Sequence, residues 1–128
     1  MKHNDIGKYG EDIASDYLKK NGFSVIERNI HFSHNEIDII AKNKEFIIFV
    51  EVKTRSVGSD LYSPFGTPGA AVNSAKQKRT IAAAKDYLRV NYGKWSKLQP
   101  RIDVIEVYLD KDTAKTLKIN HIENAFLA

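Results

Sequence analysis

The sequence predicts an α/β fold in which a central sheet is flanked by helices, and two observations lead to this prediction. Apolar residues recur at helical spacing in two segments, while five shorter segments are rich in β-branched and aromatic residues. In chain order the elements are one helix, three strands, a second helix and two strands, without an internal repeat or a linker. A sheet covered by helices is the simplest way to bury these apolar faces.

The first helix is predicted over residues 5–21. Asp5 is placed to cap its N-terminus, and apolar residues such as Ile13 and Leu18 recur at helical spacing. Gly22 then supplies a stop signal. The second helix is predicted from residue 70 or 73 to about residue 90.

The strands are predicted from runs of β-branched and aromatic residues. A turn at residues 42–45 joins the second and third strands, and the last strand is expected at an edge of the sheet. Glycines and prolines make residues 55–69 a surface loop. The five predicted strands span residues 23–30, 36–41, 46–54, 101–109 and 116–122.

Length and composition limit the class of protein. A chain of 128 residues with 42% hydrophobic content predicts one domain over residues 1–128. The absence of cysteine excludes a disulfide framework, thiolate zinc sites and a thiol nucleophile. The longest aliphatic and aromatic run, residues 46–50, is far shorter than the ~20 residues of a membrane helix. With no apolar signal region near the N-terminus, we expect a cytoplasmic protein with no membrane partner.

The net charge of +4 and the pI near 9.2 fit a protein that contacts phosphate. The positions of the basic residues are more informative about binding than the net charge, because several of them fall on the predicted second helix. Such a helix either contacts a DNA backbone or has an ordinary solvated face. The basic residues concerned are Lys76, Lys78, Arg79, Lys85 and Arg89.

Three charged residues stand inside apolar strands, where a charge needs a partner, a ligand or solvent. Asp38 lies between Ile37 and Ile39. In the next strand side chains alternate between faces, so Glu51 and Lys53 share one side. These residues are the first sign of a functional site.

A hairpin with its turn at residues 42–45 places Asp38 opposite Phe49. On that register Asp38, Glu51 and Lys53 lie on one sheet face, with the two carboxylates as diagonal neighbours. A shift of one residue would move Asp38 to the other face. Neighbouring carboxylates repel unless a proton, a cation or an amine intervenes, and oxygen ligands suit Mg²⁺ or Mn²⁺. An internal salt bridge is the alternative.

The pattern of Asp38 followed by Glu51-Val52-Lys53 resembles the PD-(D/E)xK nuclease signature. Longer stretches between about Gly7 and Val107 resemble the bacterial YraN-like family, which is similar to archaeal Holliday junction resolvases. The stretches that carry this resemblance are Gly7-Lys8-Tyr9-Gly10-Glu11, Glu36-Ile37-Asp38-Ile39-Ile40-Ala41, Phe49-Val50-Glu51-Val52-Lys53-Thr54-Arg55 and Arg101-Ile102-Asp103-Val104-Ile105. The resemblance implies a restriction-endonuclease-like core with a central mixed sheet. One departure is Asn35, which stands where that family usually has glycine.

The resemblance also implies roles for individual residues. Asp38 and Glu51 would be ligands of Mg²⁺ or Mn²⁺, Lys53 the catalytic lysine and Glu11 a further catalytic acid that faces the metal. Glu11 could equally complement the dipole of the first helix. Arg55 would grip a phosphate or else pair with a nearby carboxylate. The start of the second helix would lie beside the active site and contribute the DNA contacts Lys76, Gln77, Lys78 and Arg79.

The function expected from these features is metal-dependent hydrolysis of phosphodiester bonds in DNA, with branched or structured DNA among the candidate substrates. The alternative is a non-catalytic nucleic-acid-binding module on the same fold. A third reading is a structural protein in which the charged residues form an internal salt bridge. Resolution of a DNA junction would further require a homodimer. Asp103 is predicted to be a structural partner of Arg28 or Arg101.

Overall fold

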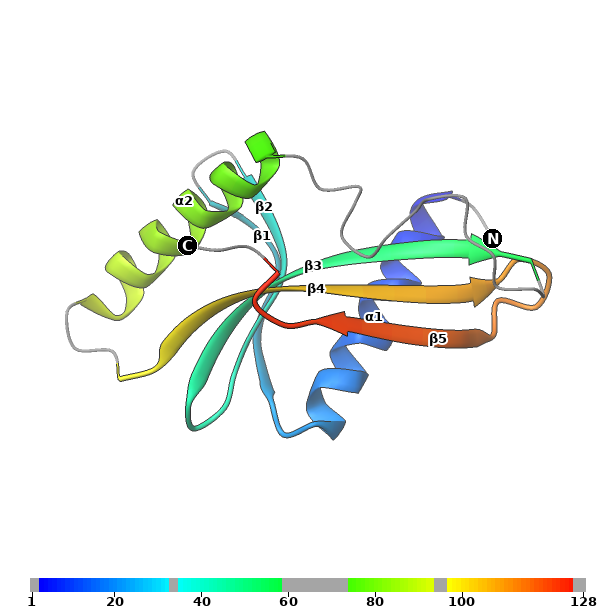
Figure 1. Cartoon of the computed structure of the whole chain (residues 1–128), viewed down its shortest axis with the longest axis horizontal. Coiled ribbons are helices and arrows are strands. Elements are labelled where there is room, and N and C mark those ends of the chain that lie inside the picture. Colours follow the sequence, from blue (N-terminus) through cyan, green and yellow to red (C-terminus); the bar gives the residue numbers. More distant parts are fainter. Residues whose placement is uncertain (1–2, 33–34, 59–73, 94–96, 126–128) are drawn as a thin grey trace.

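A five-stranded sheet lies between two helices in the computed structural model, which describes residues 3–32, 35–58, 74–93 and 97–125 (Figure 1). The strands lie side by side in chain order, and β3 and β4 are parallel while the other neighbours are antiparallel. The predicted α/β fold with a mixed sheet flanked by helices is therefore confirmed. The elements are α1 (His3–Lys20), β1 (Ser24–Phe32), β2 (Asn35–Lys42), β3 (Phe46–Val57), α2 (Ser74–Asn91), β4 (Gln99–Asp110) and β5 (Thr116–Ile122).

The first helix ends as predicted but begins earlier. α1 starts at His3, so the prediction that Asp5 is the N-cap was wrong. Asp5 instead lies in the first turn, where a negative charge complements the helix dipole. At the other end the N–H of Asn21 donates to carbonyls of the last turn, and Gly22 adopts a left-handed φ of 90°. Neither α1 nor α2, the helices of the described part of the chain, is long and apolar enough to cross a membrane.

The β2–β3 hairpin has a register two residues away from the predicted one. Phe49 pairs with Ile40 and not with Asp38. The cause is the turn, where Oδ1 of Asn43 accepts the N–H groups of Glu45 and Phe46 at 2.9 and 2.7 Å and thereby forms a longer loop. Because the shift is an even number of residues, each side chain of the paired segment keeps its predicted face.

The parallel pair at the centre of the sheet is longer than predicted. β3 continues to Val57 because each of its residues pairs with β4, which itself begins at Gln99. The first residues of the predicted loop, 55–57, therefore belong to β3. Gly58 follows the end of β3, and residues 59–69 of that loop lie outside the described residues.

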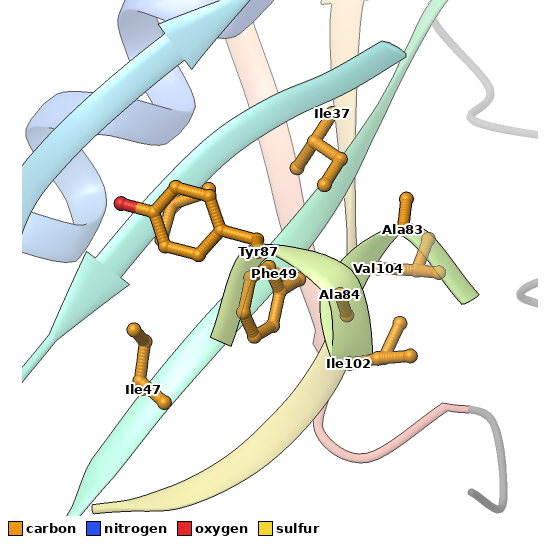
Figure 2. Close-up of a cluster of buried hydrophobic side chains, with 9 residues drawn as sticks. Ile37, Ile47, Phe49, Ala83, Ala84, Tyr87, Ile102 and Val104 are labelled. Atoms are coloured by element: carbon orange, nitrogen blue, oxygen red, sulfur yellow. The ribbon is translucent and has the colours of Figure 1, made fainter. Parts of the chain in front are cut away.

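Each face of the sheet packs against one helix, which gives two apolar clusters. The α2-side cluster consists of Ile37, Ile40, Ile47, Phe49, Ala83, Ala84, Tyr87, Ile102 and Val104 (Figure 2). The α1-side cluster consists of Ala14, Leu18, Ile39, Ala41, Ile48, Val50, Ile105, Val107 and Leu109. The central strands are thus buried on both faces, which explains their nearly continuous apolar sequence.

Candidate active site

A pocket of about 190 Å³ lies where the N-terminal half of α1 meets β2 and β3. It brings together side chains from three segments that are distant in the sequence. Glu11, Asp38 and Lys53 all line it, so the structure gathers three of the four predicted catalytic residues at one pocket. The remaining lining residues are Ile6, Gly7, Val52 and Thr54.

The close packing of α1 on β3 depends on Gly10. A Cβ at this position would lie 1.8 Å from Oγ1 of Thr54, which leaves no space for any larger residue. Gly10 therefore lets the helix backbone approach the strand directly after Lys53. This approach brings Glu11, the next residue of α1, to the pocket.

Asp38 lies where β2 leaves the regular pairing with β3. The last Cα pair of that ladder is Ile39 with Val50, and beyond it Oδ2 of Asp38 accepts the N–H of Val52 at 2.8 Å. Burial raises the pKa of Asp38 to about 7, because the hydrogen bond from Val52 only partly offsets the desolvation. The negative charges of Glu51, Glu11 and Glu36 contribute smaller parts of this rise.

Glu51 and Lys53 form an ion pair on one face of β3, as their spacing predicts. Lys53 Nζ lies 3.1 Å from Glu51 Oε1, and the two side chains are 26% and 8% exposed. The amine is therefore held beside the Glu51 carboxylate but still reaches solvent. Its partner is Glu51, whereas an internal salt bridge to Asp38 is not among the ion pairs of the described residues.

Among the residues described, the carboxyl group of Glu11 lacks a hydrogen-bond donor at one of its two oxygens. Within the described part of the chain its Oε1 is buried and accepts no hydrogen bond. Burial raises the pKa of Glu11, while a hydrogen bond from the Asn29 side chain and the charge of Arg28 lower it. A buried carboxylate oxygen without a donor is a position that a cation or a proton would stabilise.

The carboxylates do not form a complete metal cage by themselves. Among the residues that the structure describes, no group of three or more acidic or histidine side chains has the arrangement of a metal site. Glu51 pairs with Lys53 and is not among the described residues that line the pocket. Mg²⁺ is commonly held by only one or two carboxylates together with water and substrate phosphates, so its chemistry does not require three protein ligands.

The family to which the chain belongs follows from comparison with known proteins. The model of the uncharacterised protein family UPF0102 matches residues 10–107. The chain belongs to this family. UPF0102 proteins of Caldanaerobacter subterraneus and Clostridium perfringens are 41% and 45% identical to it, each over 94% of this chain and 93% of the relative. The sequence resemblance to the YraN-like family is therefore confirmed.

Solved structures resemble this UPF0102 protein only distantly. An XisH family protein from Nostoc punctiforme has a TM-score of 0.42 at 12% identity, covering 86% of this chain and 97% of that protein. A repair endonuclease from Pyrococcus abyssi has a TM-score of 0.41 at 15% identity, covering 89% of this chain and 41% of that protein. No site residue is inferred from either.

The predicted DNA-contacting residues of this UPF0102 protein lie in different surroundings. Arg55 is nearly buried, and its Nε lies 3.5 Å from Oε2 of Glu106. Of the two roles expected for Arg55, the structure therefore contains the ion pair with a nearby carboxylate, and the phosphate contact stays a prediction. Lys78 and Arg79 are exposed on α2, and Gln77 is half-buried. The backbone of Lys76 lies in α2, but its side chain is outside the described residues.

Two residues near the site were missed by sequence reasoning. Glu36 adds negative charge close to both Asp38 and Glu11. Asn29 lies in β1 with a left-handed φ of 52° and bonds to Glu11. The available signal was an asparagine inside a strand pattern, since asparagine is depleted in strands. Asn35, which stands where the resembled family usually has glycine, is the first residue of β2. Its side-chain amide donates to the carbonyl of Arg79 at 3.3 Å.

Asp103 belongs to a buried network away from the pocket, as predicted. Arg101 donates to both of its carboxylate oxygens at 2.9 Å, which confirms one of the two predicted partners. Arg28 pairs with Asp12 instead. His121, which sequence reasoning missed, lies 2.7 Å from Asp103 through Nε2 and 3.1 Å from the hydroxyl of Tyr17 through Nδ1. This network joins α1, β4 and β5.

Proposed function

We propose that this UPF0102 protein is a metal-dependent DNA endonuclease with a restriction-endonuclease-like core. The observation that carries the proposal is the pocket that gathers Glu11, Asp38 and Lys53 from three separate segments, with Glu51 bonded to Lys53 at its margin. A purely structural role explains this grouping poorly, because buried carboxylates that repel one another lower the stability of the fold.

The donor set fits a hard divalent cation. The ligand oxygens available at the pocket come from carboxylates, and one of them is the unpartnered Oε1 of Glu11. The sequence has no cysteine, so no thiolate competes as a ligand. Asp38, Glu51 and Glu11 would hold Mg²⁺ or Mn²⁺. When bound, such an ion supplies positive charge beside a phosphate and makes a coordinated water more acidic.

The residues of the chain have distinct roles in this proposal. Lys53, held by Glu51 at 3.1 Å, steadies the negative charge that develops on the phosphate. Val52 fixes the carboxylate of Asp38 through its N–H at 2.8 Å, so that this ligand is positioned before substrate arrives. Glu11 closes the pocket from the side of α1.

DNA is the proposed substrate, and the exposed basic residues of α2 are its proposed contacts. The hydrogen bond between Asn35 and the carbonyl of Arg79 ties the N-terminal half of α2 to the strand that carries Asp38. Lys78 and Arg79 would contact the phosphate backbone independently of sequence. Resolution of a DNA junction would need two active sites and hence a homodimer.

A non-catalytic nucleic-acid-binding module is the second candidate, and one observation favours it. The described residues contain no group of three or more acidic or histidine side chains arranged for a metal ion. A pure binder predicts salt-dependent affinity for DNA that is indifferent to Mn²⁺. The endonuclease predicts binding of Mn²⁺ at the carboxylates.

The experiment that tests the proposal is cleavage of a panel of end-labelled nucleic acids with Mg²⁺, Mn²⁺ or EDTA. The panel contains a four-way junction, a flap, a nicked duplex, a linear duplex and a single-stranded RNA. We expect cleavage of at least one DNA that is lost with EDTA, in Glu51→Gln and in Lys53→Met. Lys53→Met should retain nearly normal Mn²⁺ affinity, because an amine is not a metal ligand.

The matched control is Lys44→Met, which removes the same charge from the exposed β2–β3 turn and should retain cleavage. If the wild type cleaves nothing in the panel, or if Glu51→Gln and Lys53→Met both cleave normally, the endonuclease proposal is wrong.

A further inference from the structure

Asn29 has a backbone conformation that regular strands do not use. Its φ of 52° lies in the left-handed region, although the residue stands inside β1. Asparagine tolerates this region better than most residues, and such strained positions gather at functional sites. Asn29 is exposed, so packing in a core does not account for it.

The conformation of Asn29 coincides with a turn in the β1–β2 ribbon. Its flanking Cα pairs are Arg28 with Ile39 and Ile30 with Ile37. In a regular strand, residues two apart share one face of the sheet. Here the first pair faces α1, because Ile39 belongs to the α1-side cluster, while Ile37 belongs to the α2-side cluster (Figure 2).

β1 shows the same change of face. Arg28 pairs with Asp12 of α1 at 2.7 Å, whereas Ile30 packs against the α2-side cluster. The ribbon therefore turns over between these pairs, at the position that Asn29 and Asp38 occupy. Asp38 lies at this turn and bonds to Val52 of β3 instead of continuing the ladder.

The side chain of Asn29 makes a contact across the site. Its hydrogen bond to the carboxyl group of Glu11 lowers the pKa of Glu11. An ionised carboxylate only accepts hydrogen bonds, so the amide N–H is the donor. The other Glu11 atom, Oε1, is buried and accepts no hydrogen bond among the described residues. The Glu11 carboxyl group thus combines a bond to Asn29 with a buried oxygen that has no donor in the described part of the chain.

We propose that Asn29 is a positioning residue of this pocket: its left-handed backbone turns the ribbon at Asp38, and its amide holds Glu11 so that both carboxylates face a divalent cation. This inference rests on the proposed function, because it assumes that the carboxylates bind a metal. The arrangement resembles the usual support of metal-ligating carboxylates by hydrogen bonds from outer residues.

Two substitutions separate the contributions of backbone and side chain. Asn29→Gly keeps the left-handed conformation accessible and removes the amide. Asn29→Ala removes the amide and also disfavours the conformation. Asn124→Gly is the matched control, since Asn124 has a left-handed φ of 50° but does not line the pocket.

The readouts are the Kd for Mn²⁺ by titration calorimetry and the melting temperature in EDTA. We expect Asn29→Gly to weaken Mn²⁺ binding roughly 10- to 100-fold with little change in melting temperature, as is typical for loss of an outer hydrogen bond. Asn29→Ala should weaken binding at least as much and also lower the melting temperature. Asn124→Gly should leave the Kd unchanged.

A double substitution tests whether Asn29 acts through Glu11. In a Glu11→Gln background, Asn29→Gly should weaken Mn²⁺ binding much less than it does alone. If the wild type binds Mn²⁺ but Asn29→Gly binds it equally well, or if the two substitutions are additive, the positioning role is overturned and the proposed function stands. If the wild type itself fails to bind Mn²⁺, both are overturned.

Discussion

Substitution of Asp38 by asparagine should stabilise the metal-free protein. The carboxyl group is partly buried, bonds to Val52 and has its pKa raised from 3.8 to about 7. At about 1.36 kcal/mol for each tenfold change in proton affinity, this corresponds to roughly 4 kcal/mol of cost for the ionised form. The amide retains part of the desolvation cost, so we expect a net gain of about 1–3 kcal/mol, or roughly 4–12 °C in melting temperature at pH 8.

The dependence of this effect on pH has a definite sign. The folded protein binds a proton at Asp38 more tightly than the unfolded chain, so the stability of the wild type falls as the pH rises from 3.8 to about 7 and is level above that. The difference between Asp38→Asn and the wild type should therefore be small near pH 4 and full above pH 7.

Thermal melts across this pH range, each with EDTA and with Mn²⁺, check both statements. The control is Asp16→Asn, which removes the same charge from an exposed position of α1. Mn²⁺ should stabilise the wild type but not Asp38→Asn, because a ligand raises stability only where its affinity survives. If Asp38→Asn lowered the melting temperature and Mn²⁺ changed the melting temperature of neither protein, this reasoning would be refuted and a structural salt bridge would be favoured.

Further predictions concern packing, the buried network and the basic helix. Gly10→Ala should lower stability by about 1–3 kcal/mol through overpacking, whereas Gly7→Ala, with open space around its Cβ, should raise it by up to about 1 kcal/mol in the same thermal melts. Asp103→Asn should cost about 3 kcal/mol or more at pH 7 in urea titrations. Burial alone would raise the pKa of Asp103, but its hydrogen bonds lower it, so this contribution should vanish as the pH falls below 3.8. Replacing Lys78 and Arg79 by alanine should flatten the salt dependence of DNA binding by about one unit of slope per lost phosphate contact, and an unchanged slope would exclude the role.

The order and type of the elements could be predicted from the sequence because each has a strong local pattern. β5 has its predicted limits, and α1 ends at its predicted glycine stop. The hairpin register could not be predicted, since it depends on which N–H groups Asn43 accepts in the turn. Strand lengths also escaped local reasoning, because β3 is extended by its parallel partner.

The site shows the same division between local pattern and three-dimensional context. Glu51 and Lys53 could be paired from strand alternation alone. The contact of Glu11 with the pocket required the resemblance, because nothing in the helix pattern tells which strand the helix will meet. The turn of the ribbon at Asn29 and the pairing of Arg55 with Glu106 depend on neighbours distant in the chain, so spacing could not reveal them.

The network around Asp103 has a consequence for how the protein can be divided. The family match ends at residue 107, before β5 begins, yet β5 carries His121, which bonds to Asp103 and to Tyr17 of α1. A fragment cut at the family boundary would leave Asp103 without this partner and would remove the hydrogen bond that Tyr17 makes from the C-terminal half of the helix that carries Glu11. The last strand thus bonds to α1 through His121 and Tyr17. Expression fragments should therefore keep β5 even when only the pocket is of interest.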